Sequence, residues 1–485
     1  MTRLRIENLS VHYGTKTVLD NIAFKADAGS CWIIRGISGS GKTTLGLAIA
    51  GRIKYMGDIH IQYDENSPLP AQTLYVENWY RFTNLEGDRN FYYQQRYNRQ
   101  QRRETLTIER ELEVFGATHA LQRETLDKLI AAFNYSKVLD EQLFEVSSGE
   151  HKKLQLIKAL WLRPQLLIID QPYTGLDTAS RKTLNHLFYT YTQAGGTLLL
   201  LGNDPELPEG DLHFATMNHG KLALGDHLPT SIKKALKPLP DFLKTSPEYT
   251  STNLISMKDV NIHYDEKYVL RDINWEVNAG ERWLLQGPNG SGKSTLLSLI
   301  TADHPQAYAH DIKLFGVRRG SGESIWDIKK RIGMISPELH WYFDTTASVA
   351  DSIASGFFDA NGLYQPLRYS QKVQLEELLH FLDLYDVKNE LLATQPLGKQ
   401  RLALLGRTII KNPQLLVLDE PCQGLDNEQT QYFNDLIDEI SKNGITIIYV
   451  GHFESLLPSC LTHRLVLQEG RIVERTTTTH DAKLP

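Results

Sequence analysis

Two copies of one motif, 251 residues apart from Gly36 to Gly287, constrain the fold of this 485-residue chain more than any other feature. The motif is G-x-x-x-x-G-K-[ST], with the sequences GISGSGKT in the first half and GPNGSGKS in the second. Each copy follows an apolar segment typical of a strand (CWII, RWLLQ) and precedes an apolar segment typical of a helix. In a P-loop of this kind, backbone N–H groups and the helix N-terminus bind phosphate. We therefore predict two α/β domains that bind nucleotide phosphates.

Each P-loop is expected to supply a lysine to the β- and γ-phosphates and a hydroxyl group to Mg²⁺. The lysines are Lys42 and Lys293, and the hydroxyl groups belong to Thr43 and Ser294. The residues predicted to bind the nucleotide are Gly36, Ser38, Gly39, Gly41, Lys42, Thr43 and Thr44 in the first half and Gly287, Asn289, Gly290, Gly292, Lys293, Ser294 and Thr295 in the second.

Two apolar segments that end in a carboxylate or an amide form the second repeated feature. LLVLDEP at Leu415–Pro421 has the pattern of a buried parallel strand that ends at the ligand-binding edge of a sheet. Asp419 is predicted to hold Mg²⁺, and Glu420 to polarise the water that attacks the γ-phosphate. In the first half the segment is LLIIDQP, where Asp170 keeps the metal role and Gln171 replaces the glutamate. Because an amide cannot accept the proton of water, Gln171 cannot be a general base.

Two further motifs repeat at matching distances from these strands. VSSGE at Val146–Glu150 and QPLGK at Gln395–Lys399 each place a glycine 21 residues before the aspartate of the strand, and GLD follows both strands. Ser147 and Glu150 have the S-x-x-E spacing of a capping box, which predicts that a helix begins here. A P-loop, a VSSGE-like motif, an Asp-Glu strand and GLD in this order resemble the ATP-binding subunits of ABC proteins, and the resemblance covers both halves.

The resemblance implies ATP and Mg²⁺ as cofactors, hydrolysis of ATP to ADP and phosphate as the activity, and a pseudo-twofold pairing of the two halves. In that family each ATP lies between the P-loop of one half and the VSSGE-like signature motif of the other. Ser147 and Gly149 of the first signature motif would therefore contact ATP. The resemblance also implies that Tyr13 and Tyr264 stack on adenine, although each could instead be a buried core tyrosine.

Transferred residue by residue, the resemblance predicts one composite site with its catalytic parts in place. That site combines Lys293, Asp419, the general base Glu420 and the switch histidine His452 with the intact signature motif of the first half. We predict that ATP is hydrolysed there.

The other composite site is predicted to be degenerate. It combines Lys42, Gln171 and Asn203 with the QPLGK motif, in which Pro396 offers neither a hydroxyl group nor a backbone N–H group. We predict that this site binds ATP without hydrolysing it. The alternatives are that these substitutions are unrelated or that Gln171 is engineered, but engineering would not account for Asn203 or Pro396.

One position departs from the ABC pattern. ABC transporter subunits carry a glutamine after the strand that follows the P-loop helix, where it contacts Mg²⁺ and senses the membrane partner. In the second half Pro337 and Glu338 occupy this position, and Glu338 is a candidate Mg²⁺ ligand. In the first half the candidates are Gln94, Gln95 and the segment LYVEN at Leu74–Asn78. The departure puts coupling to a permease in doubt.

The motifs also indicate the domain organisation. We predict ATPase domains at residues 1–227 and 254–477, a semi-extended linker at 228–253 with a short helix at Ser231–Leu236, and a tail at 478–485. Each domain is expected to be an α/β P-loop domain with a mostly parallel core sheet, an antiparallel β edge and a helical subdomain. In the second helical subdomain, LEELLHFLDLYDV is predicted to form an amphipathic helix.

Composition indicates a cytoplasmic chain, or one that is peripheral on the cytoplasmic face of a membrane. No apolar run reaches the ~18 residues that a membrane-spanning helix needs. Three cysteines without C-x-x-C fit a reducing compartment. The net charge of −6 makes nucleic acid an unlikely partner, and the aromatic and basic segment Phe91–Arg103 is interpreted as a solvated surface.

Three features also resemble ModF-type tandem ATPases, which are associated with molybdate transport: the stretch His304–Gly333, Asn203, and CLTHRLVL at Cys460–Leu467. This resemblance implies an ABC transporter ATP-binding protein linked to molybdate or anion transport, with a membrane permease as partner. Arg318 and Arg319 could form an anion site, but a charged surface is the favoured interpretation. The alternative function is a soluble ATP-driven switch that acts on RNA, the ribosome or a protein partner.

Overall fold

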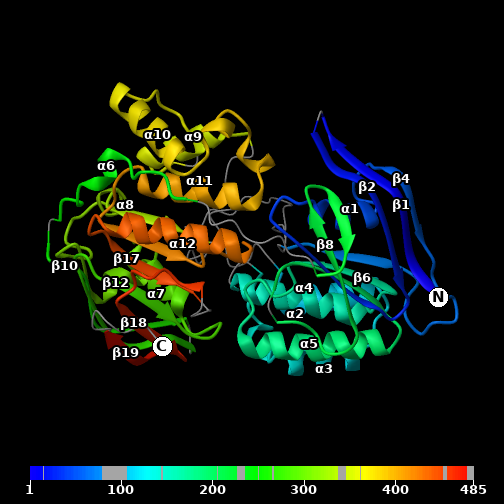
Figure 1. Cartoon of the computed structure of the whole chain (residues 1–485). Coiled ribbons are helices and arrows are strands. Elements are labelled where there is room, and N and C mark those ends of the chain that lie inside the picture. Colours follow the sequence, from blue (N-terminus) through cyan, green and yellow to red (C-terminus); the bar gives the residue numbers. More distant parts are fainter. Residues whose placement is uncertain are drawn as a thin grey trace. The chain divides into compact units, whose positions relative to one another are not determined.

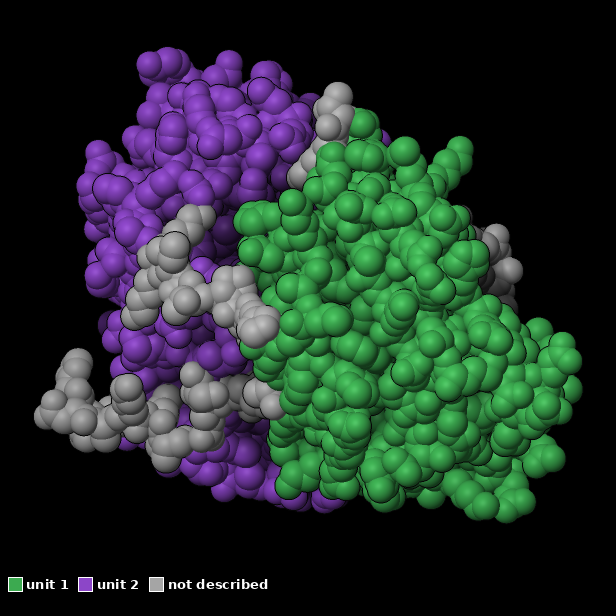
Figure 2. Space-filling model, turned by 45° about the vertical axis from the view of Figure 1, so that its right-hand side comes forward, with its two compact units in different colours: residues 1–89, 100–232 green, residues 90–99, 233–485 purple. Residues whose placement is uncertain are grey.

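The computed structural model (Figure 1) describes residues 1–14, 16–78, 106–143, 146–204, 206–226, 235–249, 251–264, 267–336, 346–360, 362–451 and 456–477. The chain forms two compact units, shown in different colours in Figure 2. Unit 1 contains residues 1–89 and 100–232, and unit 2 contains residues 90–99 and 233–485.

Unit 1 has an antiparallel sheet in the order β2-β1-β4 and a six-stranded sheet in the order β5-β6-β7-β3-β8-β9. Strands β5, β6, β7, β3 and β8 of the larger sheet run parallel, and β9 pairs antiparallel with β8. The strands are β1 (Thr2–Tyr13), β2 (Lys16–Asp27), β3 (Cys31–Gly36), β4 (Met56–Ile61), β5 (Thr73–Val76), β6 (Leu166–Asp170), β7 (Thr197–Leu201), β8 (Leu212–Asn218) and β9 (Lys221–Leu224). The helices are α1 (Lys42–Ile49), α2 (Ile108–Thr118), α3 (Arg123–Ala132), η3 (Ser136–Val138), α4 (Ser148–Leu162) and α5 (Thr178–Gln193).

Both faces of the larger sheet in unit 1 are buried. Along β6, Leu166 and Ile168 pack with α1 and the antiparallel sheet, whereas Leu167 and Ile169 pack with helices α2, α3, α4 and α5. Successive side chains of a strand point to opposite faces, so a strand that is covered on both sides must be apolar throughout. The uninterrupted apolar run that was predicted to be a buried strand has this environment.

Unit 2 repeats this arrangement. Its six-stranded sheet has the order β15-β16-β17-β12-β18-β19, and its antiparallel sheet has the order β11-β10-β13-β14. The strands are β10 (Asn253–Tyr264), β11 (Lys267–Asn278), β12 (Arg282–Gln286), β13 (Asp311–Leu314), β14 (Val317–Arg318), β15 (Ile332–Ile335), β16 (Leu415–Asp419), β17 (Thr446–Val450), β18 (His463–Gln468) and β19 (Arg471–Thr477). The helices are α6 (Asp241–Lys244), α7 (Lys293–Ile300), η4 (Pro305–Ala309), α8 (Ile325–Lys329), α9 (Val349–Ala354), η6 (Ser355–Phe357), α10 (Tyr369–Phe381), η7 (Tyr385–Val387), η8 (Leu392–Thr394), α11 (Leu397–Ile409) and α12 (Asn427–Ser441).

The predicted fold class is confirmed in both units, including the helical subdomains. The amphipathic helix predicted in unit 2 corresponds to α10, whose Leu375, Leu378 and Leu379 are buried. Helix α10 ends at Phe381, earlier than the predicted segment, and a separate 3₁₀ turn follows at Tyr385–Val387. Within the described residues, no helix combines the length and the apolar character needed to cross a membrane.

The described residues before β10 contain one short helix and contact the core of unit 2. Leu243 of the short helix α6 is buried in the core of unit 2. Tyr249 donates its hydroxyl hydrogen bond to the Gly444 carbonyl oxygen, and Gln414 Nε2 donates to the Glu248 carbonyl oxygen. We call residues 235–249 the strap. The predicted helix at Ser231–Leu236 falls mostly outside the described residues. Helix α6 lies later in the chain, where Leu243 packs in the apolar core of unit 2.

Candidate functional site

The first P-loop connects β3 to α1, as the motif predicts. Gly36, Gly39 and Gly41 have φ angles of 149°, 76° and 107°. A Cβ atom on Gly36 would lie 2.2 Å from the Met217 carbonyl oxygen, so that only glycine fits this approach. Lys42 Nζ donates to the Gly36 carbonyl oxygen at 2.5 Å and to that of Ile37 at 3.1 Å.

The second P-loop, between β12 and α7, has the same backbone. Gly287, Gly290 and Gly292 have φ angles of 152°, 74° and 99°. Lys293 Nζ donates to the Gly287 and Pro288 carbonyl oxygens at 2.7 Å and 3.0 Å. The two loops therefore share one conformation, and each lysine side chain folds into its own loop. Both loops have the fold on which the predicted phosphate contacts depend.

The two predicted Mg²⁺ ligands of unit 1 lie in contact. Thr43 Oγ1, at the start of α1, donates to Asp170 Oδ2, at the end of β6, over 2.6 Å. The Tyr75 hydroxyl group donates to the same carboxylate oxygen at 3.2 Å. Burial raises the pKa of Asp170, while the hydrogen bonds from Thr43 and Tyr75 and the charge of Lys152 lower it. A hydroxyl and a carboxylate oxygen at this spacing fit the hard oxygen ligands that Mg²⁺ prefers.

The corresponding residues of unit 2 occupy equivalent positions. Ser294 lies in the first turn of α7, and Asp419 is the last residue of β16. Asp419 is more exposed than Asp170. Met334 of β15 lies where unit 1 has Tyr75, because β5 pairs with β6 in the same register as β15 pairs with β16. The metal position of unit 2 therefore lacks the tyrosine hydroxyl that unit 1 provides.

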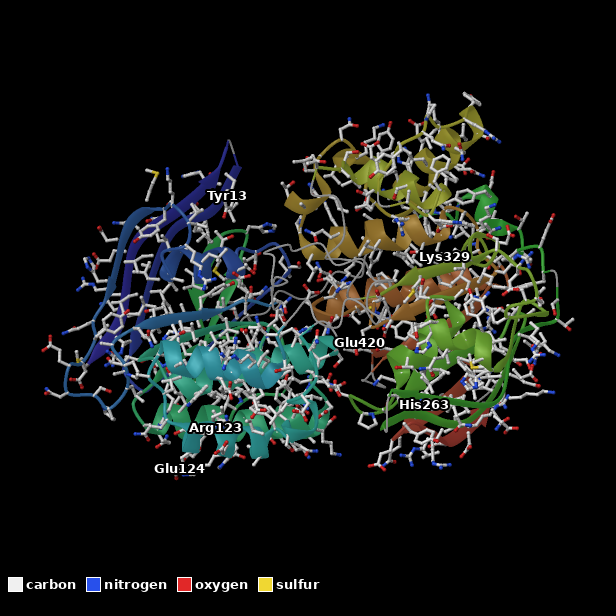
Figure 3. The ribbon with its side chains drawn as sticks, turned by 180° about the vertical axis from the view of Figure 1, so that it is seen from behind. Tyr13, Arg123, Glu124, His263, Lys329 and Glu420 are labelled. Carbon is white, nitrogen blue, oxygen red and sulfur yellow. The ribbon has the colours of Figure 1, made fainter. Side chains whose placement is uncertain are left out.

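Gln171 and Glu420 occupy the same backbone position in their units. Their φ angles are 49° and 44°, in the left-handed region that residues other than glycine adopt infrequently. The N–H group of Gln171 donates to the Leu201 carbonyl oxygen at 2.8 Å, and that of Glu420 donates to the Val450 carbonyl oxygen at 3.2 Å. Glu420 is labelled in Figure 3, next to the end of β16. The exchange of a carboxylate for an amide therefore leaves the local backbone unchanged.

The switch position of unit 1 is occupied by an asparagine. Asn203 follows β7 and forms a reciprocal pair with the first glycine of the P-loop. Its Nδ2 atom donates to the Gly36 carbonyl oxygen at 2.8 Å, and its Oδ1 atom accepts from the Gly36 N–H group at 3.0 Å. His452, its predicted counterpart, lies outside the described residues.

The signature motifs begin helices in both units. Ser147 is the N-cap of α4 and forms the predicted capping box with Glu150. The Glu150 N–H group donates to Ser147 Oγ at 3.3 Å, and the Ser147 N–H group donates to Glu150 Oε2 at 2.8 Å. Gly149 lies in the first turn of α4. In unit 2 Pro396 is the N-cap of α11 and provides no side-chain cap, as its chemistry requires.

Strand pairing favours one of the candidates for the altered glutamine position in unit 1. The strand β5 lies beside β6 at the edge of the sheet, as β15 lies beside β16, so that Glu77 and Asn78 follow the equivalent strand. The LYVEN segment is thus the structural counterpart. The other candidates, Gln94 and Gln95, lie outside the described residues, as do Glu338 of unit 2 and the segment Phe91–Arg103.

Two ionisable groups of unit 1 with shifted pKa values, the buried Lys152 and the partly buried Asp204, were not found from the sequence. Lys152 Nζ donates to the Asp170, Glu77 and Asn78 carbonyl oxygens at 3.1, 3.3 and 3.5 Å, and burial lowers its pKa to about 8. Burial also raises the pKa of Asp204, next to the switch residue, to about 6. The sequence of α4 gives no signal for this buried lysine, because lysine side chains are ordinarily exposed.

The tyrosine at the end of β1 is not a core residue. Tyr13 is 52% exposed and lies near the tip of the β1–β2 hairpin (Figure 3), so that its ring is accessible for stacking and the buried alternative is wrong for this residue. Tyr264 ends β10 and pairs with Lys267 across a hairpin, as Tyr13 pairs with Lys16. The side chain of Tyr264 lies outside the described part of the structure.

The arginine pair suggested as an anion site has internal partners. The guanidinium group of Arg319 is buried and donates to Glu323 Oε1 at 2.6 Å and to the Tyr308 hydroxyl group at 3.1 Å. Arg318 is exposed and lies 3.9 Å from Asp311. The interpretation as a charged surface is therefore correct for Arg318 and wrong for Arg319, because Glu323 compensates the charge of Arg319 inside the fold.

Comparison with known proteins supports one family for both units. The ABC transporter family model matches residues 19–174 and 270–423. The chain is 35% identical over 466 residues to the ABC transporter ATP-binding protein ModF of Escherichia coli, which covers 90% of this chain and 91% of that protein. It is 30% identical over 491 residues, 96% of this chain and 99% of the relative, to an uncharacterized ABC transporter ATP-binding protein of Schizosaccharomyces pombe.

A third relative is an uncharacterized ABC transporter ATP-binding protein of Saccharomyces cerevisiae, which is 28% identical over 72% of this chain and 73% of its own length. Both family matches begin before the P-loops and end just after the strands that carry Asp170 and Asp419. The chain therefore belongs to the ABC transporter family, in which it is an ATPase with two ATP-binding domains in tandem.

Proposed function

We propose that the two ATP-binding domains have different roles: the P-loop of unit 2 hydrolyses ATP, and the P-loop of unit 1 binds ATP without hydrolysing it. The observation that carries this proposal is the shared backbone position of Glu420 and Gln171, with φ angles of 44° and 49°. Because the two side chains leave the same point of the same fold, the difference between them is chemical. A carboxylate accepts a proton from water, whereas a carboxamide does not.

At the hydrolytic site Glu420 would accept the proton of the attacking water, with His452 as the switch residue that contacts the γ-phosphate. Lys293, Ser294 and Asp419 would bind and orient the phosphates. Mg²⁺, when bound by Ser294 and Asp419, would neutralise phosphate charge. Tyr264 would stack on adenine, and Ser147 and Gly149 of unit 1 would complete the site.

At the second proposed site, Lys42, Thr43, Asp170 and Tyr13 would bind ATP and Mg²⁺. The contact of 2.6 Å between Thr43 and Asp170 supports metal binding. Pro396 occupies the position of the signature serine. Because proline has no hydroxyl group and no N–H group, this signature motif would make fewer contacts to ATP. The P-loop and the metal-binding groups are thus present, while the general base and the signature serine are replaced.

In the cell we propose an energising role in molybdate or anion transport, on the membrane's cytoplasmic face and with a permease as partner. Support comes from the likeness to ModF, which is described as an ABC transporter ATP-binding protein. The alternative is a soluble ATP-driven switch acting on RNA, the ribosome or a protein. One observation favours it: Asn78 follows β5 in the place of the glutamine that ABC transporter subunits carry.

ATP turnover by matched variants tests the division of roles. Glu420→Gln gives unit 2 the side chain of Gln171, and we expect turnover to fall at least about a hundredfold, the contribution of a general base. Gln171→Ala in unit 1 should lower turnover much less, because this amide does not take a proton. Equal losses from the two variants would contradict the proposal.

The cellular role needs a separate measurement. Glu420→Gln protein, incubated with ATP, would be purified gently from cells of its source, with the same protein in ADP as the control. An integral membrane protein recovered with ATP alone would support transport. Recovery of ribosomes, RNA or a soluble protein instead would support the alternative.

A further inference from the structure

We propose that Asn203 is a positioning residue that holds the first P-loop in its phosphate-binding conformation. The proposal rests on the proposed function, since it concerns how the unit 1 site retains nucleotide. It assigns Asn203 a role that differs from that of a switch residue, which would contact the γ-phosphate itself.

The geometry that supports this role is the reciprocal pair with Gly36. Both main-chain groups of Gly36 bond to the Asn203 carboxamide, at 3.0 Å for the N–H group and 2.8 Å for the carbonyl oxygen. The Gly36 carbonyl oxygen also accepts from Lys42 Nζ at 2.5 Å. Asn203 therefore fixes the residue where the loop leaves β3, and through this residue it orients the lysine that the phosphates require.

An asparagine suits this position and a histidine does not. The oxygen and nitrogen of a carboxamide lie side by side, so that one accepts from an N–H group while the other donates to the adjacent carbonyl oxygen. The donor and the acceptor of a neutral imidazole lie on different sides of its ring. A histidine at position 203 could satisfy one group of Gly36 but not both.

Holding Gly36 should prolong the residence of bound nucleotide. A loop that is already ordered loses less conformational entropy when it binds phosphate, so that affinity rises without a new contact to the ligand. Asn203 would act on the whole loop, whose N–H groups surround the phosphates common to ATP and ADP. Its removal should therefore accelerate the release of ATP and ADP by the same factor.

A matched control for the hydrogen bonds exists in the same unit. Gln165, just before β6, also forms a reciprocal pair with one residue: its Oε1 atom accepts from the Asp64 N–H group at 2.8 Å, and its Nε2 atom donates to the Asp64 carbonyl oxygen at 2.8 Å. Gln165 lies at the opposite end of β6 from Asp170. Gln165→Ala removes the same kind of pair at a distance from the P-loop, together with one further hydrogen bond from Nε2 to the Leu69 carbonyl oxygen at 2.9 Å.

The experiment measures nucleotide release from unit 1 of the full-length chain. Lys293→Ala removes the P-loop lysine of unit 2, and dissociation of fluorescently labelled ATP and ADP is followed after a chase with unlabelled nucleotide. Adding Asn203→Ala should increase both dissociation rates about tenfold, the effect of losing two ordinary hydrogen bonds. Asn203→His should give the same increase. Gln165→Ala should change the melting temperature but not the rates.

Three outcomes would overturn the proposal: unchanged release in Asn203→Ala, faster release of ATP alone, or the wild-type rate in Asn203→His. The last two would identify a residue that senses the γ-phosphate. Phosphate production by the Lys293→Ala chain is measured in parallel. Hydrolysis there would refute the proposed division of roles, while the ADP dissociation rates would still test the role of Asn203.

Discussion

Replacing the carboxylate of Asp204 by an amide should stabilise unit 1 at neutral pH, although it removes an ionic group. Asp204 follows Asn203 and is partly buried. The positive charges of Arg181 and Lys152 lower its pKa. Burial raises its pKa more than these two cations lower it. Both cations keep other partners without Asp204: Arg181 Nε donates to the Leu176 carbonyl oxygen at 2.9 Å, and Lys152 Nζ donates to that of Asp170 at 3.1 Å. Asp204→Asn therefore does not leave either cation isolated.

The size and the sign of the effect follow from the pKa of this carboxyl group. Its pKa is about 6 in the folded unit and 3.8 without the influence of the fold. The folded state thus binds the proton more tightly than the unfolded state, and this contribution to stability is complete below pH 3.8 and lost as the pH rises through about 6. The difference between the two pKa values corresponds to ~3 kcal/mol of folding free energy. This is an upper limit, because partial exposure to solvent screens the charge of Asp204.

Amide hydrogen exchange in strand β7 measures the effect within unit 1. At each pH from 4 to 8, exchange in Asp204→Asn is compared with exchange in the wild-type chain, so that intrinsic exchange rates cancel. We expect equal rates near pH 4 and slower exchange in the variant above pH 6, by up to roughly a hundredfold. Asp211→Asn, at an exposed position, serves as the control for the loss of a carboxylate and should not slow exchange at pH 7. Faster exchange in Asp204→Asn at pH 7 would show that attraction to Arg181 and Lys152 outweighs burial, and would refute the reasoning.

Three other substitutions test separate parts of the structure. Ser147→Ala removes the α4 cap and should lower the free energy of unfolding of unit 1 by about 1 kcal/mol. It should also strongly reduce ATP turnover, whereas Ser147→Thr should retain the cap. Unchanged turnover in Ser147→Ala would exclude a role of Ser147 in the catalytic site. Tyr13→Ala should weaken ATP binding in the Lys293→Ala chain several-fold, as expected for the loss of ~1 kcal/mol of stacking. Tyr13→Phe keeps the ring and should not weaken binding. An unaltered melting temperature of the Tyr13→Ala variant would show that the effect is not due to unfolding. Leu243→Ala in the strap should lower the free energy of unfolding of unit 2, measured in urea, by about 3 kcal/mol, as for other buried leucines. A decrease below ~0.5 kcal/mol would show that the strap is not part of the core.

The sequence predicts the fold well because its motifs mark strand ends. A P-loop requires a strand before it and a helix after it, and the runs LLIID and LLVLD can be apolar throughout only in a sheet that is covered on both faces. These constraints occur twice, and the two six-stranded sheets have the same strand order. The capping box at Ser147 is equally local, since both of its partners lie within one helical turn.

The features that the sequence does not reveal depend on distant partners. The glutamine-equivalent position of unit 1 follows from the pairing of Thr73 with Leu166, which lie far apart in the chain. Leu243 lies in a segment rich in proline and polar residues, and only the packing on unit 2 makes it a core residue. Lys152 and Arg319 have the side chains of surface residues, and their burial depends on carbonyl or carboxylate groups that local patterns do not place. Such residues become visible only when the tertiary contacts are known.

The pattern of what unit 1 keeps and what it lacks favours a working nucleotide site over a decayed one. Thr43 and Asp170 remain in contact at 2.6 Å, and Lys42 folds into its loop as Lys293 does in unit 2. Loss of function without further constraint would affect binding groups as readily as catalytic ones. Instead, Gln171 replaces the group that would act on bound ATP, and Asn203 adds two hydrogen bonds to the P-loop. These residues together fit the proposed role of unit 1, which is to bind ATP without hydrolysing it.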